Sequence, residues 1–246
     1  MKFKKIAVVI LAVLMIVSTA LPIMAADSSD AVCELIAHGQ TSGTKYTDFY
    51  TALKAINADG YTIKMLVPSY SFAPSQTDVK YNFTWDGEYA SGQRCKITLT
   101  ANAYLMMIHD GATFKNLDVT SYVGLRYSNT VSANPFNLEN VNWRIASNIV
   151  TNIQGTVGTN AQTMNLTNCR IDTTSTNTGT PVIGIYTGVT GGSPCDVYIN
   201  LHNSTLTQNG GATNNAGNRA VINANIRHNL VVSALKKRRI YRKIRF

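Results

Sequence analysis

A six-residue pattern with asparagine at its third position occurs four times in the chain. In each window an apolar residue opens the pattern, a small or apolar residue follows the asparagine, and an apolar residue closes it. The windows are Phe114–Val119, Leu138–Trp143, Leu166–Ile171 and Leu201–Leu206. Their asparagines are Asn116, Asn140, Asn168 and Asn203, separated by 24, 28 and 35 residues. Recurrence at this spacing is typical of folds built by stacking structural repeats.

The windows predict two short strands that meet at a bend. Side chains alternate between apolar and polar on either side of the asparagine, as they do along a strand. Asparagine tolerates the left-handed backbone that a bend of this kind requires. If the repeats stack in parallel about 4.8 Å apart, the four asparagines form a hydrogen-bonded ladder. Two inward columns are then expected: Phe114, Leu138, Leu166 and Leu201, and Val119, Trp143, Ile171 and Leu206.

A helix is predicted before the repeats, over residues 47–59. Thr47 is a candidate N-cap, and Phe49, Leu53 and Ile56 recur at helical spacing. Gly60 is expected to end the helix. A strand with alternating side chains is predicted over residues 61–67, and only short β-rich runs follow, at 96–100, 104–108 and 181–186.

The asparagine-cornered repeats, together with the helix and strand at residues 46–67, resemble the right-handed parallel β-helix of the pectate-lyase-like superfamily. The resemblance covers about residues 44–226 and implies an all-β solenoid with a short N-terminal capping helix. We place the β-helix domain at residues 27–226. A propeller or a sandwich is the alternative, but neither accounts for one asparagine per repeat. The resemblance implies little about activity, because one fold hosts many functions.

The net charge of +9 belongs to the two ends of the chain. Residues 27–226 hold 11 basic and 13 acidic side chains, so no nucleic-acid partner is expected. Residues 1–26 combine three lysines, an apolar run and the pair Ala25 and Ala26, which is the pattern of a cleaved secretory signal. We therefore expect a protein exported by the general secretory route, secreted or at the cell surface, with no membrane span after cleavage.

Residues 227–246 form a basic tail with eight Lys or Arg and no acidic residue. One interpretation is a native cap, with a helix starting at 230–235, or a wall-binding segment. A second is the truncated or frame-shifted end of a longer β-helix, which the abrupt change of composition favours. A third is a tail that binds nucleic acid or membrane.

Four cysteines are present: Cys33, Cys95, Cys169 and Cys195. In an oxidising compartment they allow two disulfides in three possible pairings, and buried free thiols are the alternative. The four histidines do not cluster near them, so we expect no metal site.

Candidate ligand-binding residues lie at the outward positions of the windows. The stacking predicts that Asp118, Arg144, Arg170 and Asp172 share one face. Arginine presents a planar fork that suits the carboxylates of uronate polymers. The alternative is a surface ladder of opposite charges that relieves repulsion between repeats. Trp85 is a candidate for stacking on a sugar ring, with core packing as its alternative.

Catalysis has no support from sequence motifs. Enzymes of the resembled superfamily use clustered aspartates or calcium-binding carboxylates, and none of their signatures occurs here. We therefore predict a non-catalytic glycan-binding or adhesion module, without a cofactor, whose partner is an extracellular polysaccharide or a cell-surface glycan. One alternative is a divergent or truncated polysaccharide lyase or glycoside hydrolase, in which Ca²⁺ enters only for a lyase. A purely structural surface repeat is the other.

Overall fold

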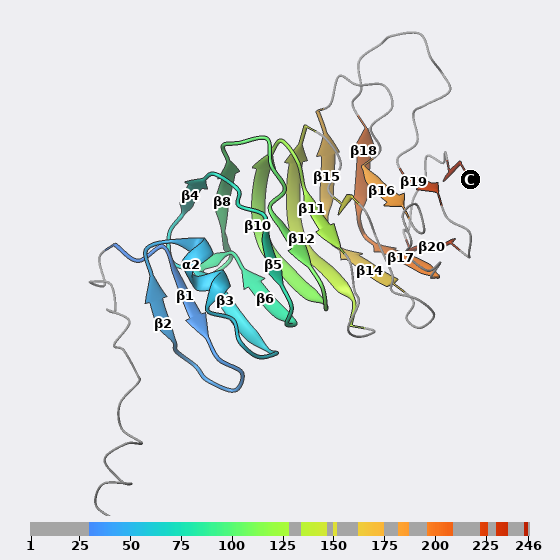
Figure 1. Ribbon diagram of the computed structural model, residues 1–246. Helices are drawn as coiled ribbons and strands as arrows, with labels where there is room; N and C mark the ends of the chain where they lie inside the picture. The colour runs from blue at the N-terminus through green and yellow to red at the C-terminus, as the bar shows by residue number, and fades with distance from the viewer. Residues whose placement is uncertain are drawn as a thin grey trace, which may run out of the picture.

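The structure is a computed structural model of the 246-residue chain. It describes residues 30–127, 134–146, 150–151, 162–174, 182–186, 196–208, 222–225, 230–235 and 244–245. These residues are mostly β-strand, in parallel and mixed sheets, with one short helix among them (Figure 1). The expected secretory signal lies outside the described residues, as does Cys195.

An antiparallel unit covers the N-terminal end of the strands. Strand β1 (Cys33–Ile36) pairs antiparallel with β2 (Thr44–Tyr46) and with β3 (Tyr61–Met65). Helix α2 (Phe49–Lys54) packs beside them and buries Phe49 and Leu53 in the core. A short helix and two strands thus close this end of the molecule.

The predicted helix was too long, and its N-cap was assigned to the wrong residue. The structure begins the helix at Phe49 and ends it at Lys54. Asp48, not Thr47, is the N-cap, because its carboxylate accepts from the backbone N–H of Thr51 at 2.8 Å. The C-cap is Ala55, so Gly60 with φ +83° belongs to the turn before β3 rather than to the helix end.

The remaining strands stack in parallel on three faces. The first face contains β3, β6 (Phe83–Asp86), the first half of β10 (Ala112–Ser121), the first half of β12 (Phe136–Ile145), β14 (Gln162–Thr167), β17 (Val197–His202) and β20 (Leu230–Leu235). The second face contains β4 (Ser69–Phe72), β8 (Gln93–Leu99), the second halves of β10 and β12, β15 (Arg170–Thr173) and β18 (Thr205–Gln208). The third face contains β5 (Thr77–Val79), β9 (Met106–Ile108), β11 (Leu125–Tyr127), β13 (Val150–Thr151), β16 (Ile183–Tyr186), β19 (Ile222–Asn225) and β21 (Ile244–Arg245).

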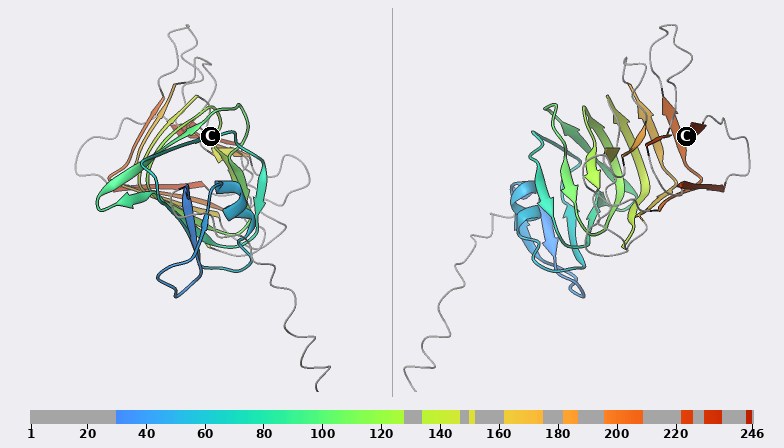
Figure 2. Two further views of the ribbon diagram at one scale, coloured as in Figure 1. Left: turned by 90° about the vertical axis from the view of Figure 1, so that its left-hand side faces the viewer. Right: turned by 45° about the vertical axis from the view of Figure 1, so that its right-hand side comes forward.

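Seen along the stack, the three faces surround a common interior (Figure 2). Side chains from all three faces fill this interior as one hydrophobic cluster. The register confirms both expected inward columns. Phe114 pairs with Leu138, Leu138 with Leu166 and Leu166 with Leu201, and the column from Val119 through Trp143 and Ile171 to Leu206 pairs likewise.

The four repeat asparagines have left-handed backbones, with φ of +57°, +56°, +54° and +48° in chain order. The expected ladder of side-chain amides is only partly formed. Asn140 donates to Asn116 at 2.9 Å, and Asn116 donates to Asp86 at 3.1 Å. The amide oxygen of Asn140 accepts from Arg94 instead of from Asn168. The asparagines therefore set the corners, and Arg94 interrupts the ladder.

A second, unpredicted ladder runs along the first face. Asn200 donates to Asn165 and Asn165 to Asn137, each at 2.8 Å, and Asn137 donates to Thr113 at 3.1 Å. The sequence signal is an asparagine three residues before the corner asparagine in the last three windows. Amide bonds between adjacent strands thus reinforce the stack on this face.

The described residues of the basic tail form two strands. Leu230–Leu235 is strand β20, parallel to β17, so the predicted start of a capping helix there was wrong. Ile244–Arg245 pairs with β19. The parallel sheets therefore extend beyond the expected domain boundary at residue 226.

Candidate functional site

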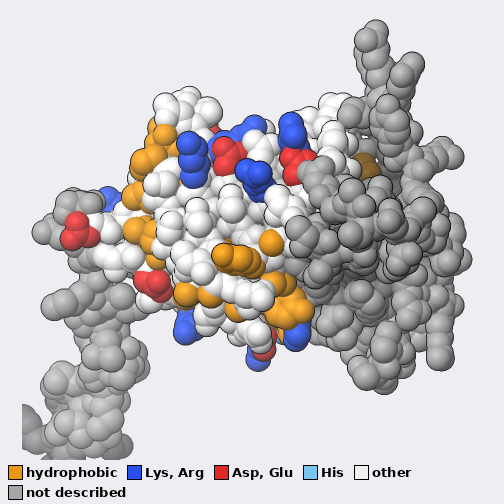
Figure 3. Space-filling view, turned by 90° about the horizontal axis from the view of Figure 1, so that it is seen from above, with side chains coloured by type: hydrophobic (Ala, Val, Ile, Leu, Met, Phe, Trp, Pro, Cys, Tyr) orange, Lys and Arg blue, Asp and Glu red, His pale blue; other side chains and the backbone are white. Residues whose placement is uncertain are grey.

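The second face carries two outward columns of polar side chains that line an open groove of about 420 Å³. One column is Lys96, Asp118, Asn142 and Arg170, and the other is Thr98, Thr120, Arg144 and Asp172. The four residues expected on one face therefore do lie together. Seen from above, basic and acidic side chains are interleaved in a row along the molecule (Figure 3).

Asp118 is held from two sides. The Nη1 of Arg94 lies 3.3 Å from its Oδ1, and the same oxygen accepts from Asn142 at 2.8 Å. Arg94 comes from the antiparallel pair of β7 (Glu88–Ala90) and β8, which is inserted at the corner of one repeat. It also donates to the amide of Asn140. Asp118 therefore helps to anchor this hairpin to the stack.

Asp172 and Arg170 form an ion pair along a single strand, with 2.7 Å between Nε and Oδ2. The Arg170 side chain is 71% exposed and that of Asp172 only 20%. The second oxygen of Asp172, Oδ1, is buried and has no hydrogen-bond partner among the described residues. Burying that oxygen without a hydrogen-bond donor costs free energy.

Arg144 is exposed, and its register neighbours are Thr120 and Asp172. Its guanidinium makes no ion pair or hydrogen bond within the part of the chain that the structure describes. Lys96, also exposed, has no ion pair there either. With Arg94 and Arg170, the groove region holds four basic side chains against the two aspartates. The groove therefore has a positive excess that is available to an anion.

Trp85 does not belong to this surface, and its assignment to sugar stacking was wrong. The side chain is 0% exposed and pairs in register with Ile63 and Phe114. Its ring centroid lies 4.5 Å from that of Phe49 and 5.2 Å from that of Phe114. The alternation within β6 turns both Phe83 and Trp85 inward.

The most exposed large aromatic side chain among the described residues is Tyr122, at 52%. It directly follows β10, two positions after the groove residue Thr120. Sequence reasoning overlooked it, although Asp118, Thr120 and Tyr122 share the outward parity of the strand.

The three described cysteines are buried free thiols. Burial raises the pKa of Cys33 and of Cys95 to about 12. Burial also raises the pKa of Cys169, whose Sγ lies 3.2 Å from the carbonyl oxygen of Leu138 and 3.3 Å from that of Thr167, so its one S–H can donate to either. For these three cysteines the structure therefore has free thiols and not disulfides. Neutral thiols of this kind are poor nucleophiles and poor metal ligands.

Three further findings concern metal sites, membrane spans and similarity to known proteins. The described residues contain no group of three or more His, Cys, Asp or Glu side chains placed to hold a metal ion. Within the same residues, no helix has the length and apolar character needed to cross a bilayer. No family model, curated protein or solved structure matches the chain.

Proposed function

We propose that this protein is an exported right-handed parallel β-helix of the pectate-lyase-like type, and that it binds acidic glycans without cleaving them. The fold proposal is supported by the parallel pairing of successive strands on three faces and by the left-handed asparagines at one corner. The export proposal rests on the secretory pattern of residues 1–26.

The observation that carries the binding proposal is the guanidinium of Arg144, which has no partner among the described residues and lies beside Asp172 in register. An arginine can grip a carboxylate through two parallel N–H bonds. The Oδ2 of Asp172, which accepts from Arg170, has a second lone pair that can accept a hydroxyl hydrogen at the next strand. A donor fork for a carboxylate and an acceptor for a hydroxyl, one strand spacing apart, match the two polar groups that every uronate residue carries.

The shape of the groove favours a polymer over a small molecule. It crosses strands β8, β10, β12 and β15, which follow one another at about 4.8 Å. Basic side chains stand at three of these four strands: Lys96 on β8, Arg144 on β12 and Arg170 on β15. A chain laid across the strands would thus meet cations repeatedly, and repeated weak contacts add up.

Cleavage is the less favoured alternative. Hydrolysis needs a carboxylic acid that can give up a proton and a second carboxylate that can act as base or nucleophile. Both aspartates of the groove already accept hydrogen bonds from an arginine. The remaining side chains lining the groove include no histidine and no further carboxylate.

The test measures binding and turnover in the same samples. The purified protein is titrated with polygalacturonate, and bound fraction, reducing ends and unsaturated products are followed together. We expect binding without product, and at least a fivefold loss of affinity in Arg144→Ala, about 1 kcal/mol. Product formation that requires Arg144 would replace the binding proposal with the enzyme alternative.

A matched pair of lysine variants separates local recognition from overall charge. Lys96→Ala removes an exposed cation from the groove, and Lys64→Ala removes an exposed cation from the first face. Both variants lower the net charge by one. The proposal requires weaker binding in Lys96→Ala only, and equal losses in both would indicate unspecific attraction.

A further inference from the structure

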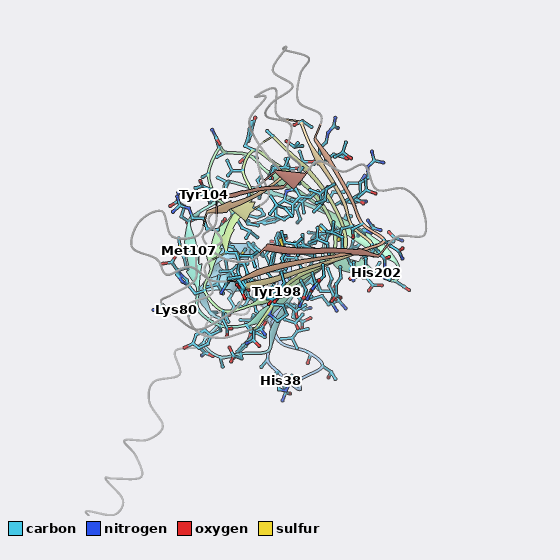
Figure 4. All side chains as sticks on the ribbon, turned by 90° about the vertical axis from the view of Figure 1, so that its right-hand side faces the viewer. His38, Lys80, Tyr104, Met107, Tyr198 and His202 are labelled. Carbon is cyan, nitrogen blue, oxygen red and sulfur yellow. The ribbon has the colours of Figure 1, made fainter. Side chains whose placement is uncertain are left out.

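A second, smaller pocket of about 210 Å³ lies on the third face, at strands β5, β9 and β11. Its lining residues are Gln76, Asp78, Tyr104, Met106, Met107 and Arg126. Looking from the C-terminal end of the stack, Tyr104 and Met107 lie on one flank, away from Tyr198 and His202 of β17 (Figure 4). This third-face pocket shares no lining residue with the groove on the second face.

Arg126 is the polar centre of the third-face pocket. Its Cζ lies 4.3 Å from the centroid of the Tyr104 ring, which is the geometry of a cation–π contact. Its Nε is buried and has no hydrogen-bond partner among the described residues. A buried N–H donor on a charged group is expensive to leave unsatisfied, and such a group calls for an acceptor.

No carboxylate of the described residues neutralises Arg126. The pocket's one acidic residue, Asp78, is in register with Met107, and Met107 is in register with Arg126. Asp78 is thus two strand spacings away, about 10 Å. Its Oδ1 lies 3.7 Å from Nε2 of His109 instead. The pocket therefore presents a cation at one end, an acceptor at the other and the Met107 side chain between them.

We propose that the third-face pocket binds a single carboxylate carried on a small hydroxylated body, such as one acidic monosaccharide residue. The guanidinium of Arg126 takes the carboxylate, while the Tyr104 ring covers one side of the guanidinium and holds it in place. Met107 supplies an apolar floor for the ring of the ligand. Gln76 and Asp78 take its hydroxyl groups. This inference does not depend on the proposed function of the groove.

The test titrates the full protein with galacturonate, with galactose as the uncharged sugar and with acetate as a carboxylate without a sugar. We expect galacturonate to bind at least about tenfold more tightly than galactose, since hydrogen bonds to charged groups contribute about 1.5–3 kcal/mol. Binding of acetate comparable to that of galacturonate would show that the hydroxylated body contributes nothing, which contradicts the proposal. Equal binding of galacturonate and galactose, or no binding of either acid, overturns the proposal.

Variants locate the site and separate it from the groove. Arg126→Gln is expected to lose at least about tenfold in galacturonate affinity, because the charged donor is gone. Lys80→Gln, an exposed cation on the same flank (Figure 4), is expected to bind galacturonate as the parent does. In an Arg144→Ala background, Arg126→Gln should lower the affinity by the same factor as in the parent, because the two sites share no lining residue. An unchanged affinity in Arg126→Gln, in either background, refutes the assignment.

A stability readout guards against a folding defect. Galacturonate should raise the thermal unfolding midpoint of the parent but not of Arg126→Gln, because only a ligand that binds the folded state stabilises it. If Arg126→Gln does not fold, Tyr104→Leu replaces it. That variant keeps the cation but removes the ring that holds it, and it should still lower the affinity. A parent-like ligand-induced shift in the variant that folds would contradict the proposal.

Discussion

The side-chain amide of Asn140 donates to the side-chain oxygen of Asn116 over 2.9 Å, and both residues have φ values close to +57°. Equivalent corners of two successive repeats are thus joined by a bond that does not involve the backbone ladder. Asn140 also accepts from Arg94, which in turn reaches Asp118 in the groove. The corner that shapes the fold is therefore connected to the candidate binding face.

Asn140→Ala is expected to lower the free energy of unfolding by about 2–3 kcal/mol. Alanine loses both amide bonds and carries a left-handed backbone penalty of about 1–2 kcal/mol. Asn140→Gly also loses both hydrogen bonds, but glycine adopts a positive φ without strain. We therefore expect this variant to lower the free energy of unfolding by only about 1 kcal/mol. Chemical denaturation of the two variants separates the contribution of the hydrogen bonds from that of the left-handed backbone. Equal costs for both would mean that the positive φ contributes nothing.

Gly87 occupies the corresponding corner one repeat earlier, and we expect Gly87→Ala to be strongly destabilising. A Cβ there would lie 2.3 Å from the carbonyl oxygen of Asn116 and 2.4 Å from Cδ2 of Leu117. Overpacking against backbone costs about 1–3 kcal/mol or more. Gly92→Ala is the control, since nothing lies within 4 Å of its Cβ and only its φ of +69° is unfavourable. Denaturation midpoints should fall further for Gly87→Ala than for Gly92→Ala, and the reverse order would contradict the corner packing.

Alkaline pH is expected to destabilise the fold. Burial raises the pKa of Cys33 and Cys95 from 9.0 to about 12, and that of Tyr50 from 10.0 to about 12. Above pH 9 the unfolded chain releases these protons while the folded chain retains them, so stability falls as the pH rises from about 9 to about 12. Urea unfolding across this range measures the slope, which Cys95→Ala should reduce. A stability that is flat over this range would show that these groups ionise freely in the folded protein.

Trp85→Ala is expected to cost about 3–5 kcal/mol, as large truncations in a packed core do. Its ring contacts link α2 to β6 and β10 through Phe49 and Phe114. Polysaccharide affinity per folded molecule should stay at the parent value, because the side chain is fully buried and far from solvent. Stability and binding are measured on the same preparation. A loss of binding with unchanged stability would instead indicate that Trp85 lies at the surface and contacts the ligand.

The repeat windows predicted the register of the strands on the second face. Apolar alternation and the asparagine at the corner allow only one alignment of each window with the next. Sliding one window by a single residue would turn Val119 or Trp143 outward. Asp118, Arg144, Arg170 and Asp172 follow from that alignment alone. The sequence could predict that these four side chains share a face, because strand periodicity alone determines which side chains point outward.

Other features depended on contacts that the sequence does not display. The hairpin at Glu88–Arg94 is an insertion whose arginine takes the bond that Asn168 would have made to Asn140. The aromatic residues around Trp85 come from α2 and from a later strand, so its burial is a tertiary effect. The third-face pocket combines strands β5, β9 and β11, whose short segments show little periodicity.

On the binding proposal, the second-face groove recognises the carboxylates of an acidic polysaccharide. The most direct measurement compares the affinity of the protein for polygalacturonate before and after full methyl esterification, at fixed ionic strength. Esterification removes the charge and keeps the sugar backbone, so it isolates the carboxylate contribution. We predict that affinity falls at least about tenfold on esterification and that the fall is smaller in Arg144→Ala. Equal affinity of the parent protein for the two polymers would contradict the claim.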